Sequence, residues 1–188
     1  MRRGFSAALK LRRVSAPDTQ GPGESQEVLR RLEAAEERDV IERALAAARE
    51  RLGMDAAYIT TITPQAQTIE SLVSDTENFR AYEGTVTPLE ETYCVRMLRG
   101  DMPNLVPDTR IEPAVQDLAA TKVVGAYAGV PVRLPDGTVH GTICCVSASP
   151  VTGLGPEELR FMEVLADMVS QRLTRAQGNL ARLLRRNS

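Results

Sequence analysis

Two long apolar segments joined by an Asp-Gly dipeptide constrain the fold of this chain more than any other feature. The segments are residues 122–134 (KVVGAYAGVPVRL) and 138–149 (TVHGTICCVSAS), with Asp136-Gly137 between them. Asp-Gly between two β-type segments is a strong signal for a tight hairpin. Because these are the most apolar strand candidates in the sequence, the pattern predicts two adjacent strands at the centre of a sheet.

A second hairpin and a short edge strand complete the predicted sheet. Residues 56–63 (AAYITTIT) and 66–74 (AQTIESLVS) are rich in β-branched side chains, and a Pro-Gln pair separates them, which predicts a β-hairpin. Residues 75–86 are polar and irregular. The three prolines within residues 102–113 leave room only for a short edge strand at residues 104–106, and residues 113–120 can form one or two helical turns.

Long amphipathic helices are predicted at both ends. Residues 27–52 contain neither Gly nor Pro, and Gly53 suits a left-handed helix end. The second helix starts at Gly155-Pro156, with Leu154 and Leu159 placed as a hydrophobic staple. Both helices carry apolar stripes, and the second stripe continues beyond what a small domain needs, which indicates a helix partner. The residues expected in a dimer interface are Ile41, Leu45, Met162, Val169, Leu173 and Leu180.

A shorter helix is predicted in the middle of the chain. Thr87 stands as N-cap, Pro88 as the first helical residue and Glu90 as the third, which is a capping box with the favoured proline. The helix is expected to run to about Leu98 and to stop at Gly100. Cys94 would then lie in the middle of the helix, away from the N-terminal dipole that lowers a thiol pKa.

The side-chain inventory excludes several chemistries. With His140 as its only histidine, the chain cannot build a multi-histidine metal site by itself, and its three cysteines lack CxxC spacing. Phosphate loops and nucleophile elbows are absent from the sequence. No apolar run reaches the roughly 18–20 residues of a membrane span, and residues 1–13 lack the apolar core of a secretory signal. We therefore expect a soluble cytoplasmic protein without a metal.

Charge and composition suggest three regions. Residues 1–13 and 172–188 each carry five basic residues and no acid, which leaves 13 basic and 25 acidic residues between them, a net charge of −12. An acidic body with few aromatic residues is a poor nucleic-acid platform. The predicted division is a basic N-terminal extension and flexible linker at 1–27 (the linker itself at 14–26), a domain at 28–177 and a basic helix end or tail at 178–188.

The central motifs resemble the core of a GAF domain. They are residues 88–94 (PLEETYC), 100–109 (GDMPNLVPDT) and 125–132 (GAYAGVPV), followed by Asp136-Gly137 and residues 141–145 (GTICC). The resemblance covers roughly residues 38–175, and the form is similar to sensor modules attached to bacterial cyclic-dinucleotide enzymes and histidine kinases. It implies an α+β fold with a central antiparallel sheet of five to six strands. It also implies a small-molecule pocket between one sheet face and residues 87–121, and dimerisation through the terminal helices.

Eight residues are candidates for that pocket: Tyr58, Tyr93, Cys94, Asp108, Thr109, Tyr127, Gly129 and Thr142. Cys94 could line the pocket, act as a redox-sensitive thiol or only pack in the core. Asp108 and Thr109 could instead cap a local turn. Cys144 and Cys145 are neighbours on a strand, so their side chains should point to opposite faces.

The sequence favours a non-catalytic sensor that relays ligand occupancy through its terminal helices in a homodimer, with an output domain supplied elsewhere. The ligand and any cofactor stay unidentified, because this fold hosts many. A GAF-type methionine sulfoxide reductase is the competing enzymatic function, although a single pocket thiol lacks a resolving partner. A chromophore or haem sensor and a ligand-free dimerisation module are two further hypotheses.

Overall fold

A six-stranded antiparallel sheet separates two layers of helices and turns in the computed structural model, which describes residues 22–185. The strands are β1 (Ala56–Ile62), β2 (Ala66–Ser74), β3 (Val86–Pro88), β4 (Leu105–Val106), β5 (Ala126–Arg133) and β6 (Val139–Ser147), in the spatial order β3-β2-β1-β6-β5-β4. The helices are α1 (Pro22–Leu52), α2 (Glu77–Arg80), α3 (Tyr93–Arg99) and α4 (Pro156–Arg185). Short 3₁₀ turns lie at Leu89–Glu91, Thr109–Ile111, Pro113–Val115 and Ala119–Lys122. The predicted α+β class, with an antiparallel sheet and long terminal helices, is confirmed.

The two predicted hairpins form the middle of the sheet. β1 pairs with β2, β5 pairs with β6, and β6 also pairs with β1. A bulge interrupts the β1–β2 register, so that Ser71 faces Ile59 whereas Ile69 faces Thr60. Glu70 is the extra residue, and it is exposed. Since a bulge adds one residue to one strand, Ile69 and Leu72 can both face the side of the sheet that lies opposite the long helices.

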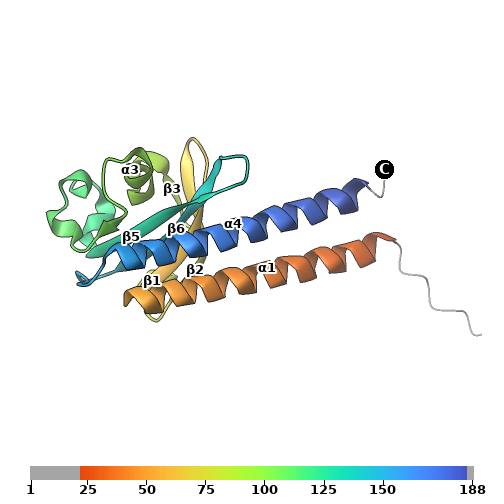
Figure 1. Ribbon diagram of the computed structural model, residues 1–188, viewed down its shortest axis with the longest axis horizontal. Coiled ribbons are helices and arrows are strands. Elements are labelled where there is room, and N and C mark those ends of the chain that lie inside the picture. The colour runs from red at the N-terminus through yellow and green to blue at the C-terminus, as the bar shows by residue number, and fades with distance from the viewer. Residues whose placement is uncertain (1–21, 186–188) are drawn as a thin grey trace, which may run out of the picture.

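The long helices α1 and α4 run antiparallel over one face of the sheet (Figure 1). Arg51 near the end of α1 pairs with Glu158 near the start of α4 (3.2 Å), and Glu36 pairs with Arg172 further along both helices (3.4 Å). Both helices extend beyond the sheet at the same end of the molecule. They start and end where local signals predict: Gly53 has φ 63°, and the amide of Gly155 donates to Glu158.

The apolar stripes of these helices are largely used inside the chain. Leu45, Met162 and Val169 are fully buried against the sheet, and Ile41 and Leu173 pack partly buried beside them. The assignment of the three buried residues to a dimer interface is therefore corrected, since their side chains already occupy the core. Leu180 belongs to α4. Among the side chains of α4 that the structure describes, the large apolar residues that stay half exposed are Val164 and Met168.

The start of the N-terminal helix also differs from the prediction. Helix α1 begins at Pro22, so residues 22–26 are helical where the sequence suggested the end of a flexible linker. A proline in the first turn is compatible with a helix start because its missing amide would be unpaired there in any case. The remainder of the predicted linker and the basic residues 1–13 lie outside the described residues. Residues 178–185 continue α4.

The predicted capping box at Thr87 is wrong. Thr87 and Pro88 belong to the edge strand β3, which pairs with β2, and residues 89–91 form a separate 3₁₀ turn. Helix α3 starts only at Tyr93, where Thr92 is the N-cap and its hydroxyl oxygen accepts from the amide of Val95. The predicted C-terminus is right, because Gly100 is left-handed with φ 79°. Strand pairing with β2 thus overrides a local helix signal.

Substitutions of Thr87 and Thr92 test which of the two threonines caps helix α3. We expect Thr92→Ala to lower the free energy of unfolding by about 1 kcal/mol, because the first turn of α3 loses its side-chain acceptor. Thr87→Ala should change it by less than about 0.5 kcal/mol, because Thr87 caps no helix. Urea unfolding followed by circular dichroism measures both. A larger loss for Thr87→Ala than for Thr92→Ala would contradict this assignment.

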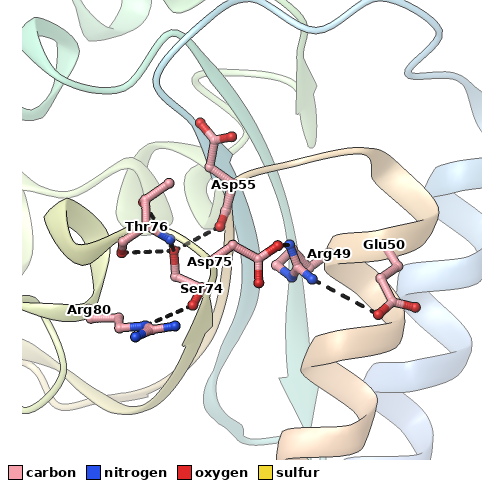
Figure 2. A network of polar contacts seen from close by, with 7 residues as sticks. All are labelled: Arg49, Glu50, Asp55, Ser74, Asp75, Thr76 and Arg80. Atoms are coloured by element: carbon pink, nitrogen blue, oxygen red, sulfur yellow. Dashed lines mark hydrogen bonds and ion pairs between the residues drawn. The ribbon is translucent and has the colours of Figure 1, made fainter.

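A polar network ties the end of α1 to the end of β2 and the start of α2 (Figure 2). Arg49, which is mostly buried, forms an ion pair with Asp75, and the Ser74 hydroxyl donates to the backbone oxygen of Asp55 at 2.8 Å. Arg80 donates to the backbone oxygen of Ser74 at 2.9 Å. The segment that follows β2 is therefore held directly against helix α1.

Among the described residues, no helix has the length and apolar character needed to cross a bilayer.

Candidate functional site

A cavity of about 390 Å³ lies on the sheet face opposite α1 and α4. Its walls come from β1 and β2 on one side, and from α2, the start of α3 and residues 119–124 on the other. The lining residues are Tyr58, Gln67, Ile69, Leu72, Phe79, Tyr82, Thr87, Glu91, Thr92, Tyr93, Cys94, Ala119, Ala120, Lys122, Val123, Val124 and Val146. The cavity thus lies between the sheet and a segment that overlaps residues 87–121, where the resemblance placed a pocket.

The wall is mostly apolar, with a few polar groups at defined places. Gln67 is buried on β2, and its side-chain Oε1 has no hydrogen-bond partner among the described residues. Glu91 and Lys122 bring opposite charges to the exposed rim. Small-molecule sites commonly combine an apolar wall with a few polar groups that orient the ligand. The arrangement suits a compact, largely apolar molecule that carries at least one hydrogen-bond donor.

Tyr93 connects the cavity wall to the loop that covers it. Its hydroxyl is 2.8 Å from Oγ1 of Thr121, which in turn donates to the backbone oxygen of Val115. Its ring packs against that of Tyr127, with the two ring centroids 5.2 Å apart. Burial raises the pKa of Tyr93 above its ordinary value, so the phenol stays protonated and able to donate.

The cavity floor contains a cluster of thiols and hydroxyls. The Sγ atoms of Cys94 on α3 and Cys144 on β6 are 3.5 Å apart. The Thr142 hydroxyl lies 3.2 Å from Cys94 Sγ, and the Tyr127 hydroxyl lies 3.4 Å from Cys144 Sγ. Thr60 on β1 extends the cluster, since its Oγ1 is 2.8 Å from Oγ1 of Thr142. All five side chains are buried.

The environments of the two clustered thiols differ. The hydrogen bond with Cys144, together with burial, raises the pKa of Cys94 well above its usual value. Burial acts in the same direction on Cys144, but hydrogen bonds with Cys94, Thr142 and the tyrosine hydroxyls outweigh it and lower the pKa of Cys144. Burial raises the pKa of Tyr127, which keeps this hydroxyl protonated. The two thiols of the pair therefore lie in different hydrogen-bonding environments.

Five of the eight predicted pocket residues gather at this site. Tyr58, Tyr93 and Cys94 line the cavity, while Tyr127 and Thr142 contact Cys94 from beneath it. Cys94 lies in the first turn of α3 rather than mid-helix, because the helix starts later than predicted. Cys144 and Cys145 point to opposite sides of the sheet as predicted, with Cys145 in the core beneath the long helices.

The other three predicted pocket residues do not line the cavity. Asp108 caps the turn that follows it by accepting from the backbone amide of Arg110 (3.1 Å), and the Arg110 guanidinium lowers the pKa of its carboxyl. The buried Thr109 hydroxyl donates to the backbone oxygen of Val124. A Cβ on Gly129 would stand 2.1 Å from the hydroxyl oxygen of Tyr127. Gly129 thus makes room for a buried ring.

Most of the cavity wall is not evident from the sequence. Gln67, Ile69 and Leu72 come from β2, where the bulge at Glu70 breaks the alternation that assigns strand residues to faces. Phe79 and Tyr82 lie in the segment predicted to be irregular. The alternation Gln67-Thr68-Ile69 before the bulge is the one signal that could have found part of this wall. Among residues 22–185, no group of three or more His, Cys, Asp or Glu side chains is placed to hold a metal ion.

The chain belongs to the GAF domain family, whose family model matches residues 36–173. No curated protein matches the sequence. The GAF-B domain of DevS from Mycobacterium smegmatis is similar in structure, with a TM-score of 0.56 and 20% identity over 80% of this chain and 98% of that one. The PixJ GAF domain of Thermosynechococcus elongatus, in its blue-light absorbing form, has a TM-score of 0.62 and 19% identity over 81% and 95%.

A GAF-fold enzyme is also among the similar structures. The type II free methionine-R-sulfoxide reductase of Thermoplasma acidophilum has a TM-score of 0.57 and 17% identity, over 72% of this chain and 91% of that one. At these identities the likeness concerns the fold.

Proposed function

We propose that this chain is a non-catalytic GAF sensor of bacterial signal transduction, which binds a small molecule in the cavity between β1–β2 and α2–α3. The observation that carries the proposal is the cavity itself: about 390 Å³ with a mostly apolar wall and the unpartnered Oε1 of Gln67. A buried carbonyl oxygen without a donor is costly. A ligand that supplies an N–H or O–H there would recover this cost.

The network at the end of α1 supports a relay from the cavity to the long helices. Phe79 in α2 lines the cavity. The next residue, Arg80, donates to the backbone oxygen of Ser74, and Asp75, just before α2, forms an ion pair with Arg49 on α1 (Figure 2). A ligand that moves α2 would displace Asp75, the partner of Arg49 on α1. A signal of this kind requires two arrangements of the helices, one of which the ligand favours.

The proposed dimer would form through the half-exposed side of α4 rather than through the buried stripe. Val164 and Met168 stand one turn apart with more than half of each side chain exposed. Side chains three or four residues apart share one helix face. If a second copy of the chain packs on this face, a change in the α1–α4 packing would directly alter the dimer interface.

The methionine sulfoxide reductase hypothesis gains one observation. The sequence offered no resolving partner for Cys94, but Cys144 Sγ lies 3.5 Å away. An assay of free methionine sulfoxide reduction, with Cys94→Ser as control, tests this hypothesis. If the wild-type protein reduces free methionine sulfoxide and the variant does not, the enzymatic function would replace the sensor function as the proposal.

The sensor proposal is tested by binding to wild type and to a cavity-filling variant. Ala120→Phe places a ring in the cavity, and we expect it to weaken binding of the fluorescent apolar probe anilinonaphthalene sulfonate by about tenfold or more, or about 1.4 kcal/mol. Ala35→Phe makes the same change on the exposed surface of α1 and should leave the affinity of the cavity for the probe unchanged. Fluorescence titration measures both.

Native mass spectrometry of gently purified protein completes the test. A dimer that carries a removable small molecule, absent from Ala120→Phe, is the expected result. A dimer without added mass and equal probe binding by both variants would favour a ligand-free dimerisation module. A monomer would contradict the proposed dimer.

A further inference from the structure

We propose that Cys94 and Cys144 form a dithiol site at the cavity floor, which a peroxide converts into an intramolecular disulfide. The carrying observation is the 3.5 Å distance between the two Sγ atoms, which come from different elements 50 residues apart in the chain. Both thiols are free in the structure. At 3.5 Å the two sulfurs are in van der Waals contact, so a modest side-chain movement brings them within bonding distance. The proposal does not depend on the ligand.

Both cysteines are buried, but they lie differently with respect to the cavity. Cys94 lines the cavity, whereas Cys144 lies behind it on β6. A molecule as small as hydrogen peroxide fits easily in a space of about 390 Å³. Cys94 is therefore the cysteine that an oxidant in the cavity meets first, and Cys144 is placed to attack Cys94 once it has reacted.

The two steps balance with peroxide as the oxidant. The Cys94 thiol, acting as its thiolate, attacks one peroxide oxygen, the O–O bond breaks, and Cys94 becomes a sulfenic acid as one water leaves. Cys144 then gives up its proton and attacks the Cys94 sulfur, the S–O bond breaks, and the hydroxyl leaves with that proton as a second water. Two thiols thus lose two electrons and two hydrogens, and one peroxide is reduced to two waters.

The hydroxyls around the pair suit this order of events. The Tyr127 hydroxyl lies 3.4 Å from Cys144 Sγ, and the Thr142 hydroxyl lies within 3.3 Å of both sulfurs. Burial raises the pKa of Cys144, but the hydrogen bonds made by its own Sγ outweigh burial and lower it, which favours the thiolate that the second step requires. The raised pKa of Cys94 makes the first step slow. Accumulation of the disulfide should therefore follow peroxide concentration and exposure time.

Cys145 is a built-in control. It neighbours Cys144 on β6 but points to the opposite sheet face, into the core beneath α1 and α4. Burial raises the pKa of its thiol well above the ordinary value. It has neither an accessible surface nor a contacting thiol among the described residues, so it should survive oxidant that consumes the other two.

The experiment counts thiols in the full chain after peroxide treatment. Protein treated with hydrogen peroxide is quenched, denatured and alkylated with iodoacetamide, then examined by intact mass and by non-reduced peptide mapping. We expect wild type to fall from three alkylated thiols to one, with a mass loss of two hydrogens before alkylation and a peptide pair that joins Cys94 to Cys144. Dithiothreitol should restore all three thiols.

Variants make the result specific. Cys145→Ala should lose both of its remaining thiols to the same linked pair, while Cys94→Ser and Cys144→Ser should form no intramolecular link. Peptide mapping of wild type alone still decides the outcome if a variant fails to fold. Three alkylated thiols after treatment, a link that involves Cys145, or only sulfinic and intermolecular products would overturn the proposal. None of these results changes the expected binding of the fluorescent probe to untreated protein.

Discussion

Gly141→Ala is expected to destabilise the domain by about 3 kcal/mol or more, a large share of the 5–15 kcal/mol that typically stabilises a domain. A Cβ at this position would stand 1.6 Å from the backbone oxygen of Thr60. Thr60 lies on β1 beside the bulge of β2, and its hydroxyl accepts from the amide of Thr142 on β6 at 3.0 Å. The obstacle is backbone in the middle of the sheet, so the methyl group can be accommodated only if the two central strands separate.

Gly178→Ala is the matched control for this experiment. Gly178 is an exposed residue of α4, and a Cβ there would meet no atom within 4 Å. Alanine should therefore stabilise the helix by roughly 0.5–1 kcal/mol through its better helix propensity. Urea unfolding of both variants gives the comparison. A Gly141→Ala protein within about 1 kcal/mol of wild type would show that the central strands are not packed as described.

Tyr127→Ala is expected to cost about 4 kcal/mol, as large-to-small changes of buried aromatic residues do. Tyr127 is the largest fully buried side chain of the domain. Its ring packs on Tyr93, and its hydroxyl fills the space that Gly129 leaves beside it. Since the surroundings are strands on one side and α3 on the other, they can collapse only partly into the space that the ring vacates.

Tyr127→Phe separates the ring from the hydroxyl. It keeps the ring and removes hydrogen bonds to weak sulfur acceptors, so a loss of about 1 kcal/mol or less is expected. Gly129→Ala tests the contact from the other side, because it should destabilise wild type but cost less when Tyr127 is already alanine. Additive losses in the double variant would contradict the close approach of Gly129 to the ring.

Local sequence signals correctly predicted the turns and helix ends whose backbone conformation is set by residues close together in the chain. The Asp136-Gly137 turn, the left-handed Gly53 and Gly100 and the start of α4 at Pro156 are all as expected. The capping pattern at Thr87 failed because the same residues complete a strand that pairs with β2. A local pattern does not reveal a competing partner 20 residues earlier in the chain.

The candidate site was predictable only in part for a similar reason. Tyr93 and Cys94 were found because they belong to motifs of the resemblance, and Tyr58 because it is an aromatic residue with a polar group on a predicted strand. Gln67 and Phe79 carry neither signal. The proximity of Cys94 to Cys144 depends on how α3 sits over the sheet. Leu45, Met162 and Val169 were misassigned to the dimer interface because a helix that packs on a sheet of its own chain and one that packs on another chain show the same spacing of apolar residues.

The antiparallel course of α1 and α4 places the beginning of one helix beside the end of the other (Figure 1). The chain therefore enters and leaves the domain at the same end of the molecule. The domain could be inserted into an exposed loop of a reporter protein without separating the two ends of that loop. A change in the spacing of the two helices would then strain the host at the splice. Because both ends of the insert lie together, a change at the cavity that alters the helix spacing would be detected as mechanical strain in the host protein.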